Sequence, residues 1–142
     1  MGNDASQTGA ARRIVIVDDD EGTQAMLADV LHAAGYTTTS WTRGAGAYEH
    51  IRRLQPDLVI LDLWLEHPQE GSMVLGLLMT DPTTQPIPVI ICSAYRQFLG
   101  YQEAQLQAQG YVLLDKPYRV DTLLTAIARL LAGDQARAVG AL

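Results

Sequence analysis

The residues best placed to do chemistry in this sequence are carboxylates that directly follow apolar runs. Asp62 comes after the apolar run 58–61, and four acidic residues at 18–21 come after the run 14–17. A carboxylate at the end of a buried strand is poorly solvated, so another group must stabilise its charge. If the two runs are adjacent parallel strands, their carboxylates meet at one edge of the sheet. Mg²⁺ prefers oxygen ligands, so the sequence predicts a magnesium site at this edge.

Two other apolar runs end in different polar groups. The run 89–92 is followed by the hydroxyl of Ser93, and the run 112–114 is followed by Asp115, Lys116 and Pro117. The ten basic residues are nine arginines and Lys116. In a chain that otherwise uses arginine, a single lysine favours a role for a compact point charge.

The elements that must position these groups alternate along the chain. β-Branched apolar runs predict strands, and apolar residues at helical spacing predict helices between them. The expected strands cover residues 13–17, 36–41, 58–63, 89–93 and 112–114, and the expected helices cover residues 22–34, 48–54, 72–80, 97–108 and 120–131. Asp20 or Glu21 is expected to cap the first helix. The alternation predicts an α/β fold with a parallel sheet, helices on both faces, and ligands bound beyond the carboxyl ends of the strands.

The length and composition indicate one globular domain. Apolar residues make up 48% of the 142 residues and charged residues 18%, and no apolar run approaches the ~20 residues that a membrane span needs. We predict a flexible N-terminal lead over 1–12, the domain over 13–132 and a short C-terminal tail over 133–142. The N-terminus has no export signal pattern. The single cysteine, Cys92, lies in an apolar run and suits a reducing cytoplasm, so we expect a cytoplasmic protein.

The net charge of −6 opposes direct binding of nucleic acid. No apolar helix for a membrane is expected, and the sequence leaves homodimerisation open.

His32 and His50 are expected to be surface groups on helices, and His67 a solvated loop residue. Each strand-end group taken alone has a simpler explanation, since acidic residues often only cap a helix.

Taken together, the four strand ends resemble those of the receiver domain of bacterial two-component response regulators, over about residues 12–132. The resemblance implies a flavodoxin-like, doubly wound (βα)5 fold with a five-stranded parallel sheet in the order 2-1-3-4-5. It implies that Asp62 is the phosphoryl acceptor. It also implies that Asp18, Asp19, Asp62 and the backbone carbonyl of Trp64 bind Mg²⁺, with Asp19 the more direct ligand of the acidic pair.

The resemblance further assigns the phosphoryl-binding and switch groups. Ser93 and Ala94 match its hydroxyl-then-small pair, and Lys116 and Pro117 match its lysine–proline pair, whose peptide bond is cis in the family. The implied function is that of a single-domain response regulator. A histidine kinase or a histidine phosphotransfer protein would supply the phosphoryl group, and phosphorylation of Asp62 would switch a protein-binding surface. The chain would then be a phosphoacceptor signalling domain rather than an enzyme.

Three features depart from the family pattern. The family usually has proline four residues and glycine eight residues after the phosphoacceptor; here these positions are Glu66 and Glu70, and Gly71 comes one residue later. A one-residue insertion is the simplest account. The position three before Lys116, often aromatic in the family, is Leu113. No output domain follows in this sequence.

Two alternative functions remain open at this stage. A degenerate receiver would bind partners without phosphorylation. A phosphatase of the haloacid dehalogenase type is suggested by the run 18–23, which comes close to that family's Asp-x-Asp-x-Thr opening, but the spacing and the short chain oppose it. The phosphoryl group would land on Asp62 in a receiver and on Asp18 in the phosphatase.

Two further expectations concern the surroundings of the site. Trp64 and Tyr95 flank the line along which water would attack an aspartyl phosphate, so these rings should slow self-dephosphorylation. The output surface is expected to be the helix from Gln97 to Ala108 together with the last helix, because Ser93 leads directly into the first of these.

Overall fold

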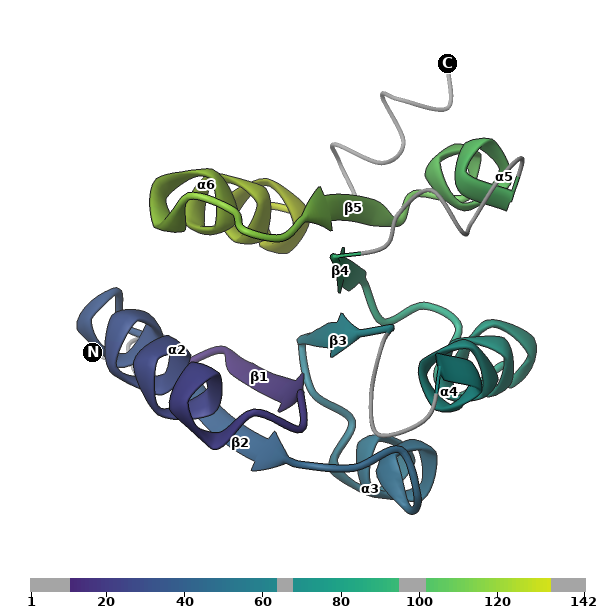
Figure 1. Ribbon diagram of the computed structural model, residues 1–142. Helices are drawn as coiled ribbons and strands as arrows, with labels where there is room; N and C mark the ends of the chain where they lie inside the picture. The colour runs from purple at the N-terminus through teal and green to yellow at the C-terminus, as the bar shows by residue number, and fades with distance from the viewer. Residues whose placement is uncertain (1–10, 64–67, 95–101, 134–142) are drawn as a thin grey trace, which may run out of the picture.

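The computed structural model describes residues 11–63, 68–94 and 102–133, and these form one parallel sheet with helices on both sides (Figure 1). Strands and helices alternate in the described residues, and the sheet has the order β2-β1-β3-β4-β5. The strands are β1 (Arg13–Val17), β2 (Thr37–Trp41), β3 (Leu58–Asp62), β4 (Val89–Ser93) and β5 (Val112–Asp115). The helices are α2 (Glu21–Ala33), α3 (Ala47–Leu54), α4 (Pro68–Thr80), α5 (Gln102–Ala108) and α6 (Val120–Leu131). The predicted flavodoxin-like fold and strand order are confirmed.

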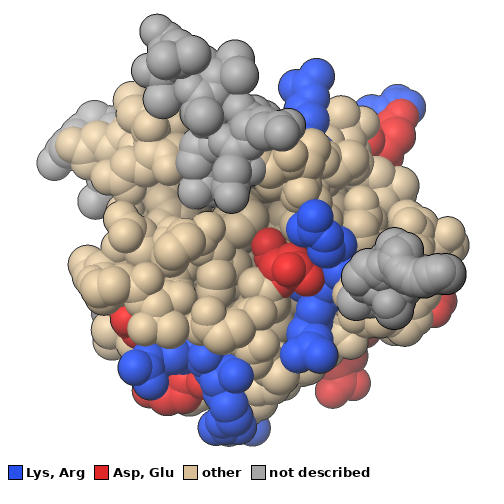
Figure 2. All heavy atoms as spheres, turned by 180° about the vertical axis from the view of Figure 1, so that it is seen from behind, with Lys and Arg blue, Asp and Glu red and all other residues tan. Residues whose placement is uncertain are grey.

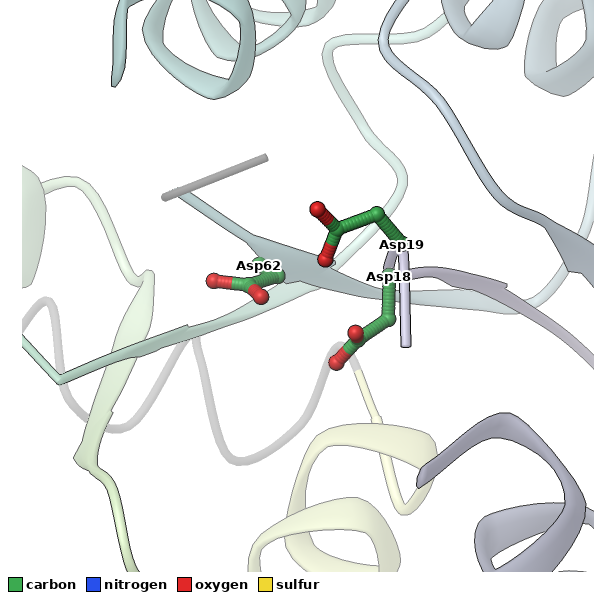
Figure 3. Close-up of side chains that lie close together, drawn as sticks. All are labelled: Asp18, Asp19 and Asp62. Atoms are coloured by element: carbon green, nitrogen blue, oxygen red, sulfur yellow. The ribbon is translucent and has the colours of Figure 1, made fainter. Parts of the chain in front are cut away.

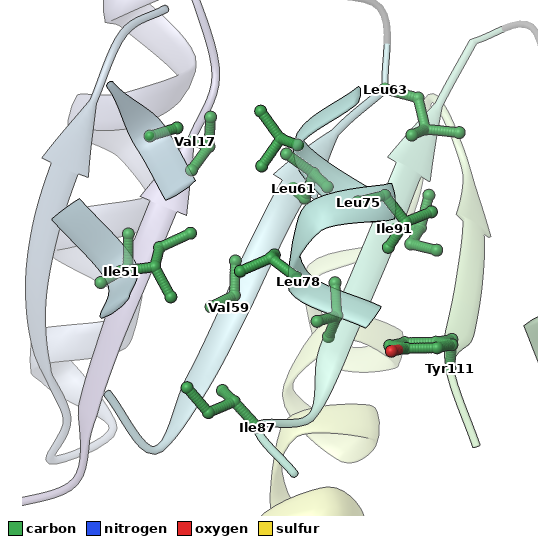
Figure 4. Packing of buried hydrophobic residues seen from close by; sticks show 14 of the residues in the cluster. Val17, Ile51, Val59, Leu61, Leu63, Leu75, Leu78, Ile87, Ile91 and Tyr111 are labelled. Carbon is green, nitrogen blue, oxygen red and sulfur yellow. The ribbon is translucent and has the colours of Figure 1, made fainter. Parts of the chain in front are cut away.

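Alternate residues of the central strands face opposite layers, because successive side chains of a strand point to opposite faces. Val15 and Val17 belong to the cluster under α3, α4 and α5, while Ile14 and Ile16 belong to the cluster under α2 and α6. Figure 1 shows these two helical layers, and Figure 4 shows the first cluster between α3, α4 and the sheet. Both faces of β1, β3 and β4 are therefore buried, as their continuous apolar sequences predict.

Asp20 caps the start of helix α2, and Gly35 follows its end. The Asp20 side chain accepts a hydrogen bond from the Thr23 backbone N–H at 2.8 Å, which caps the first turn. Gly35 follows the helix with a φ of +98°, a conformation that glycine adopts without a Cβ clash. This cap fixes where the acidic run leaves β1 and enters the helix.

Helix α4 begins earlier than the expected range of 72–80, so that prediction was wrong at its start. The helix begins at Pro68, because proline is well tolerated in a first helical turn, where its missing N–H needs no partner. The expected helix over 97–108 is described from Gln102 onward as α5. Its residues 97–101, and His67, lie outside the described residues.

Gly71 is the point of closest contact between α4 and the chain leaving β3. A Cβ at this position would lie 2.3 Å from the Leu63 carbonyl oxygen and 2.5 Å from the Leu63 Cα. Only a glycine lets the helix backbone approach so closely. The requirement falls one residue later than the glycine position that the resemblance implies, as a one-residue insertion would place it.

Two side chains in the fold show how far composition alone predicts environment. Cys92 is buried, and burial raises its thiol pKa to about 12, so it packs as the small apolar residue that the sequence predicts. His32 is exposed as expected, but His50 is half-buried and stacks on Trp41, with ring centroids 4.3 Å apart. The prediction that His50 is a surface group was therefore wrong, because Trp41 provides an apolar ring for it to cover.

Within the described ranges, no helix has both the length and the apolar character needed to cross a membrane. On the face shown in Figure 2, basic and acidic side chains lie beside one another over a largely uncharged surface.

Candidate functional site

The carboxylates of Asp18, Asp19 and Asp62 meet at the carboxyl edge of the sheet (Figure 3). The register of the parallel pair β1–β3 aligns Val17 with Leu61, so the next residues, Asp18 and Asp62, leave adjacent strands at the same level. One carboxylate oxygen from each of the three acids lies within 4.8 Å of the others. Asp18 and Asp62 are buried to 4% and 5% exposure, whereas Asp19 is exposed.

Lys116 brings a positive charge to the two buried carboxylates. Its Nζ donates to Asp62 Oδ2 at 2.9 Å and to Asp18 Oδ2 at 3.2 Å. Burial works to lower the Lys116 pKa, but the hydrogen bond to Asp62 and the charges of both carboxylates outweigh it, so the pKa lies above its usual value. The ammonium therefore stays protonated throughout the physiological range.

The backbone around Lys116 is held by β4. The Lys116 N–H donates to the Ser93 carbonyl at 2.9 Å, and the Lys116–Pro117 peptide bond is cis. Ser93 is itself buried at the end of β4, next to Asp115 in register, while Ala94 is exposed. The hydroxyl-bearing strand and the lysine-bearing strand thus end side by side at the acidic edge.

The donor set suits a divalent cation that prefers oxygen ligands. In the part of the chain that the structure describes, the three gathered carboxylates carry three negative charges, and Lys116 supplies one positive charge against them. Two of the acids are buried, where like charges repel strongly. A single Mg²⁺ would balance the remaining charge and take oxygen ligands from all three residues.

A second layer of hydrogen bonds orients Asp18. Its Oδ1 accepts from the Asp20 N–H at 2.9 Å, and its own N–H donates to the Trp41 carbonyl at 3.0 Å. The Gln24 side chain reaches the same backbone, with Nε2 lying 2.9 Å from the Asp18 carbonyl oxygen. Sequence reasoning missed Gln24. Its signal was a polar residue at helical spacing with Leu27 and Leu31, which form the buried face of α2.

Some predicted site residues lie outside the described residues. These are Trp64, including the backbone carbonyl expected to bind the metal, and Tyr95. Leu113, which departs from the family's aromatic position, is buried in the cluster under α3, α4 and α5. Tyr111 is buried in the same cluster (Figure 4).

Comparison with known proteins identifies the family. The model of the response regulator receiver domain matches residues 14–128. Protein Rrf1 of Nitratidesulfovibrio vulgaris is 33% identical over 121 residues, which cover 84% of this chain and 83% of that protein. The crystal structure of a response regulator from Chloroflexus aurantiacus J-10-fl is 27% identical, with a TM-score of 0.73, and the match covers 87% of this chain and 100% of that chain. The chain belongs to the response regulator receiver domain family.

Relatives differ in how much of their length this chain spans. The nitrogen assimilation regulatory protein NtrX of Azorhizobium caulinodans is 28% identical over 124 residues, which cover 85% of this chain but 26% of NtrX. Receiver domains are signalling phosphoacceptor domains of two-component response regulators.

Proposed function

We propose that this chain is a phosphorylation-controlled switch in which Asp62 accepts a phosphoryl group from a phosphohistidine. The donor would be a histidine kinase or a histidine phosphotransfer protein. The observation that carries the proposal is the hydrogen bond from Lys116 Nζ to Asp62 Oδ2 beside two further carboxylates at the carboxyl edge of the sheet. Asp62 combines burial, a cation at hydrogen-bonding distance and neighbouring oxygen ligands, which suits an anionic nucleophile.

The transfer needs charge compensation more than acid–base chemistry. An Asp62 oxygen would attack phosphorus, the bond from phosphorus to the donor imidazole nitrogen would break, and that nitrogen would keep the electron pair, leaving an acyl phosphate on Asp62. Lys116 would move with the arriving oxygens and neutralise part of their charge. When bound, Mg²⁺ would neutralise further phosphoryl charge. Asp18, Asp19 and Asp62 are the described residues that would hold it, and the Trp64 carbonyl is the further ligand that the resemblance implies.

The acceptor is tested by incubating the protein with Mg²⁺ and acetyl phosphate and locating the added phosphoryl group by mass spectrometry. We expect one group on Asp62 and none in Asp62→Asn. Asp29→Asn is the matched control, because Asp29 is an exposed acid of α2 whose loss changes the charge equally. Modification of Asp18 would instead support the phosphatase alternative. An unmodified parent that still binds a partner would support a degenerate receiver.

Phosphorylation would be read out on α5 and α6. Ser93 leaves β4 toward α5, and its backbone carbonyl accepts from Lys116 N–H, which leads toward α6. A Ser93 hydroxyl drawn to the phosphoryl group would therefore shift both connections. Amide exchange over residues 95–119 should change when beryllofluoride, a phosphoryl mimic, is added with Mg²⁺. Identical exchange with and without the mimic would exclude this surface as the switch.

The proposal also covers the organisation of the chain. Residues 13–132 would be the switch domain, while residues 1–10 of the predicted lead and 134–142 of the predicted tail lie outside the described residues. The protein would act in the cytoplasm, where its single thiol stays reduced. Its target would be another protein rather than nucleic acid, because the net charge is −6.

A further inference from the structure

The side chain of Gln24 joins the ends of two strands next to the acidic site. Its Nε2 lies 2.9 Å from the Asp18 carbonyl oxygen, 3.1 Å from that of Ile16 and 3.0 Å from that of Trp41. The first two carbonyls belong to the chain of β1, and the third ends β2. Gln24 is only 5% exposed, so water does not compete for these contacts.

The position of these contacts coincides with the end of the β1–β2 ladder. The strand register ends at the pair Val17 and Trp41, and the Asp18 N–H still donates to the Trp41 carbonyl at 3.0 Å. Asp18 is the residue after this last ladder pair, and Gln24 Nε2 donates to its carbonyl oxygen. The amide therefore takes the place of a further strand residue and fixes the backbone that carries Asp18 and Asp19.

The other half of the Gln24 amide has no such partner. Among the described residues, Gln24 Oε1 is buried without a hydrogen bond, which is unfavourable for a polar atom. The Gln24 Nε2 group also has only two hydrogens to donate to the three carbonyl oxygens near it. An apolar side chain would avoid the buried Oε1 but would leave the strand ends unheld. An unbonded Oε1 beside an Nε2 that holds strand ends is expected of a residue that serves to orient the neighbouring backbone.

We propose that Gln24 is a positioning residue for the metal site, acting through the backbone of Asp18. It touches neither the metal-binding oxygens nor Asp62 in the contacts described. Its amide holds the peptide of Asp18 so that the two consecutive carboxylates, Asp18 and Asp19, keep their spacing to Asp62. The inference rests on the proposed Mg²⁺ site, and residues outside a ligand shell commonly change metal affinity about 10- to 100-fold when replaced.

The test compares Gln24→Met with Thr84→Val by calorimetric titration with Mg²⁺ and by thermal unfolding. Thr84, in the loop after α4, is a matched control because it is 1% exposed and its Oγ1 donates to the Leu78 carbonyl at 2.9 Å. Both variants should unfold at lower temperature. Only Gln24→Met should raise the Mg²⁺ dissociation constant, by about 10-fold. Gln24→Asn, which keeps an amide on a shorter side chain, should raise the dissociation constant less. It replaces Gln24→Met in the test if that variant does not fold.

A second readout does not depend on the metal. The Asp20 N–H donates to Asp18 Oδ1 at 2.9 Å, so its hydrogen exchange should accelerate in the Gln24 variants and stay unchanged in Thr84→Val. Parent-like Mg²⁺ affinity in both Gln24 variants would overturn the inference while leaving the proposed function intact. A parent that binds no Mg²⁺ would overturn the metal site, and the Asp20 exchange rate would then decide whether Gln24 positions Asp18.

Discussion

The Lys116 ammonium lies 2.9 Å from Asp62 Oδ2, and the same nitrogen lies 3.2 Å from Asp18 Oδ2. One cation thus spans the ends of β1 and β3 from the end of β5. In the proposed site, Lys116 therefore contacts two of the three carboxylates that would hold Mg²⁺. Lys116 and the metal therefore share the task of neutralising the acidic edge, and the balance between them shifts when a phosphoryl group arrives.

Replacing Lys116 should expose this balance. Lys116→Met takes the ammonium from two buried carboxylates, so we expect the unfolding free energy without metal to fall by about 3 kcal/mol. Mg²⁺ should bind more tightly to the variant and restore part of that loss, while phosphorylation should slow by about 100-fold. Urea unfolding with and without Mg²⁺ measures the first two effects. Arg119→Met removes an equal charge from an exposed pair with Asp121 and should change stability far less, because exposed ion pairs contribute little.

Asp19 offers a test of the metal that leaves the fold intact. Its carboxylate is exposed yet lies with Asp18 and Asp62, so Asp19→Asn should weaken Mg²⁺ binding by about 10-fold or more and change stability by less than about 0.5 kcal/mol. Asp29→Asn, on the exposed face of α2, should leave both quantities unchanged. Equal Mg²⁺ affinity in the two variants would remove Asp19 from the ligand set.

Two glycines of α4 should respond oppositely to a single methyl group. Gly71→Ala places a Cβ against the Leu63 backbone, and we expect a loss of about 3 kcal/mol because neither backbone segment can move aside easily. A Cβ at Gly76 meets nothing within 4 Å, so Gly76→Ala should stabilise the protein by about 0.5–1 kcal/mol through helix propensity. Chemical denaturation of both variants checks the pair. A tolerated Gly71→Ala would show that α4 does not need this close contact.

The fold and most of the site could be predicted because they follow from local pattern. Continuous apolar runs define strands buried on both faces, and parallel strands necessarily bring Asp18 and Asp62 to one edge. Gln24 and His50 could not be assigned in this way. Both are polar residues on helices. The sequence predicts His50 at the surface and gives no role to Gln24, because the environment of each depends on a partner distant in sequence: the β2 end for Gln24 and the Trp41 ring for His50.

The early start of α4 had a different cause. Pro68 lies before the expected start of this helix at Ser72, although proline suits the first turn of a helix. The insertion relative to the family also made the local alignment ambiguous. The contact that resolves it, between Gly71 and Leu63, is visible only when the helix is packed on the sheet.

The lifetime of the phosphorylated state is a prediction from the sequence, since Trp64 and Tyr95 lie outside the described residues. Both positions, two after Asp62 and two after Ser93, carry aromatic rings with no carboxylate or amide to orient a water. Phosphoryl loss should therefore be slow in the parent and faster in the double variant Trp64→Asn/Tyr95→Glu. Following the phosphorylated fraction over time after removal of the donor measures both rates. Equal rates would mean that the aromatic residues do not shield the site.

His50 should make stability depend on pH. Burial lowers its pKa, with a further contribution from the positive charge of Arg53, so the unfolded chain takes up a proton at a higher pH than the folded protein does. Stability should therefore fall as the pH drops through the ordinary histidine pKa of about 6.5 and level off below the folded value. Thermal unfolding between about pH 7 and pH 5 should show this slope in the parent and lose part of it in His50→Gln. An unchanged slope in His50→Gln would show that the partial burial of His50 does not disfavour the imidazolium.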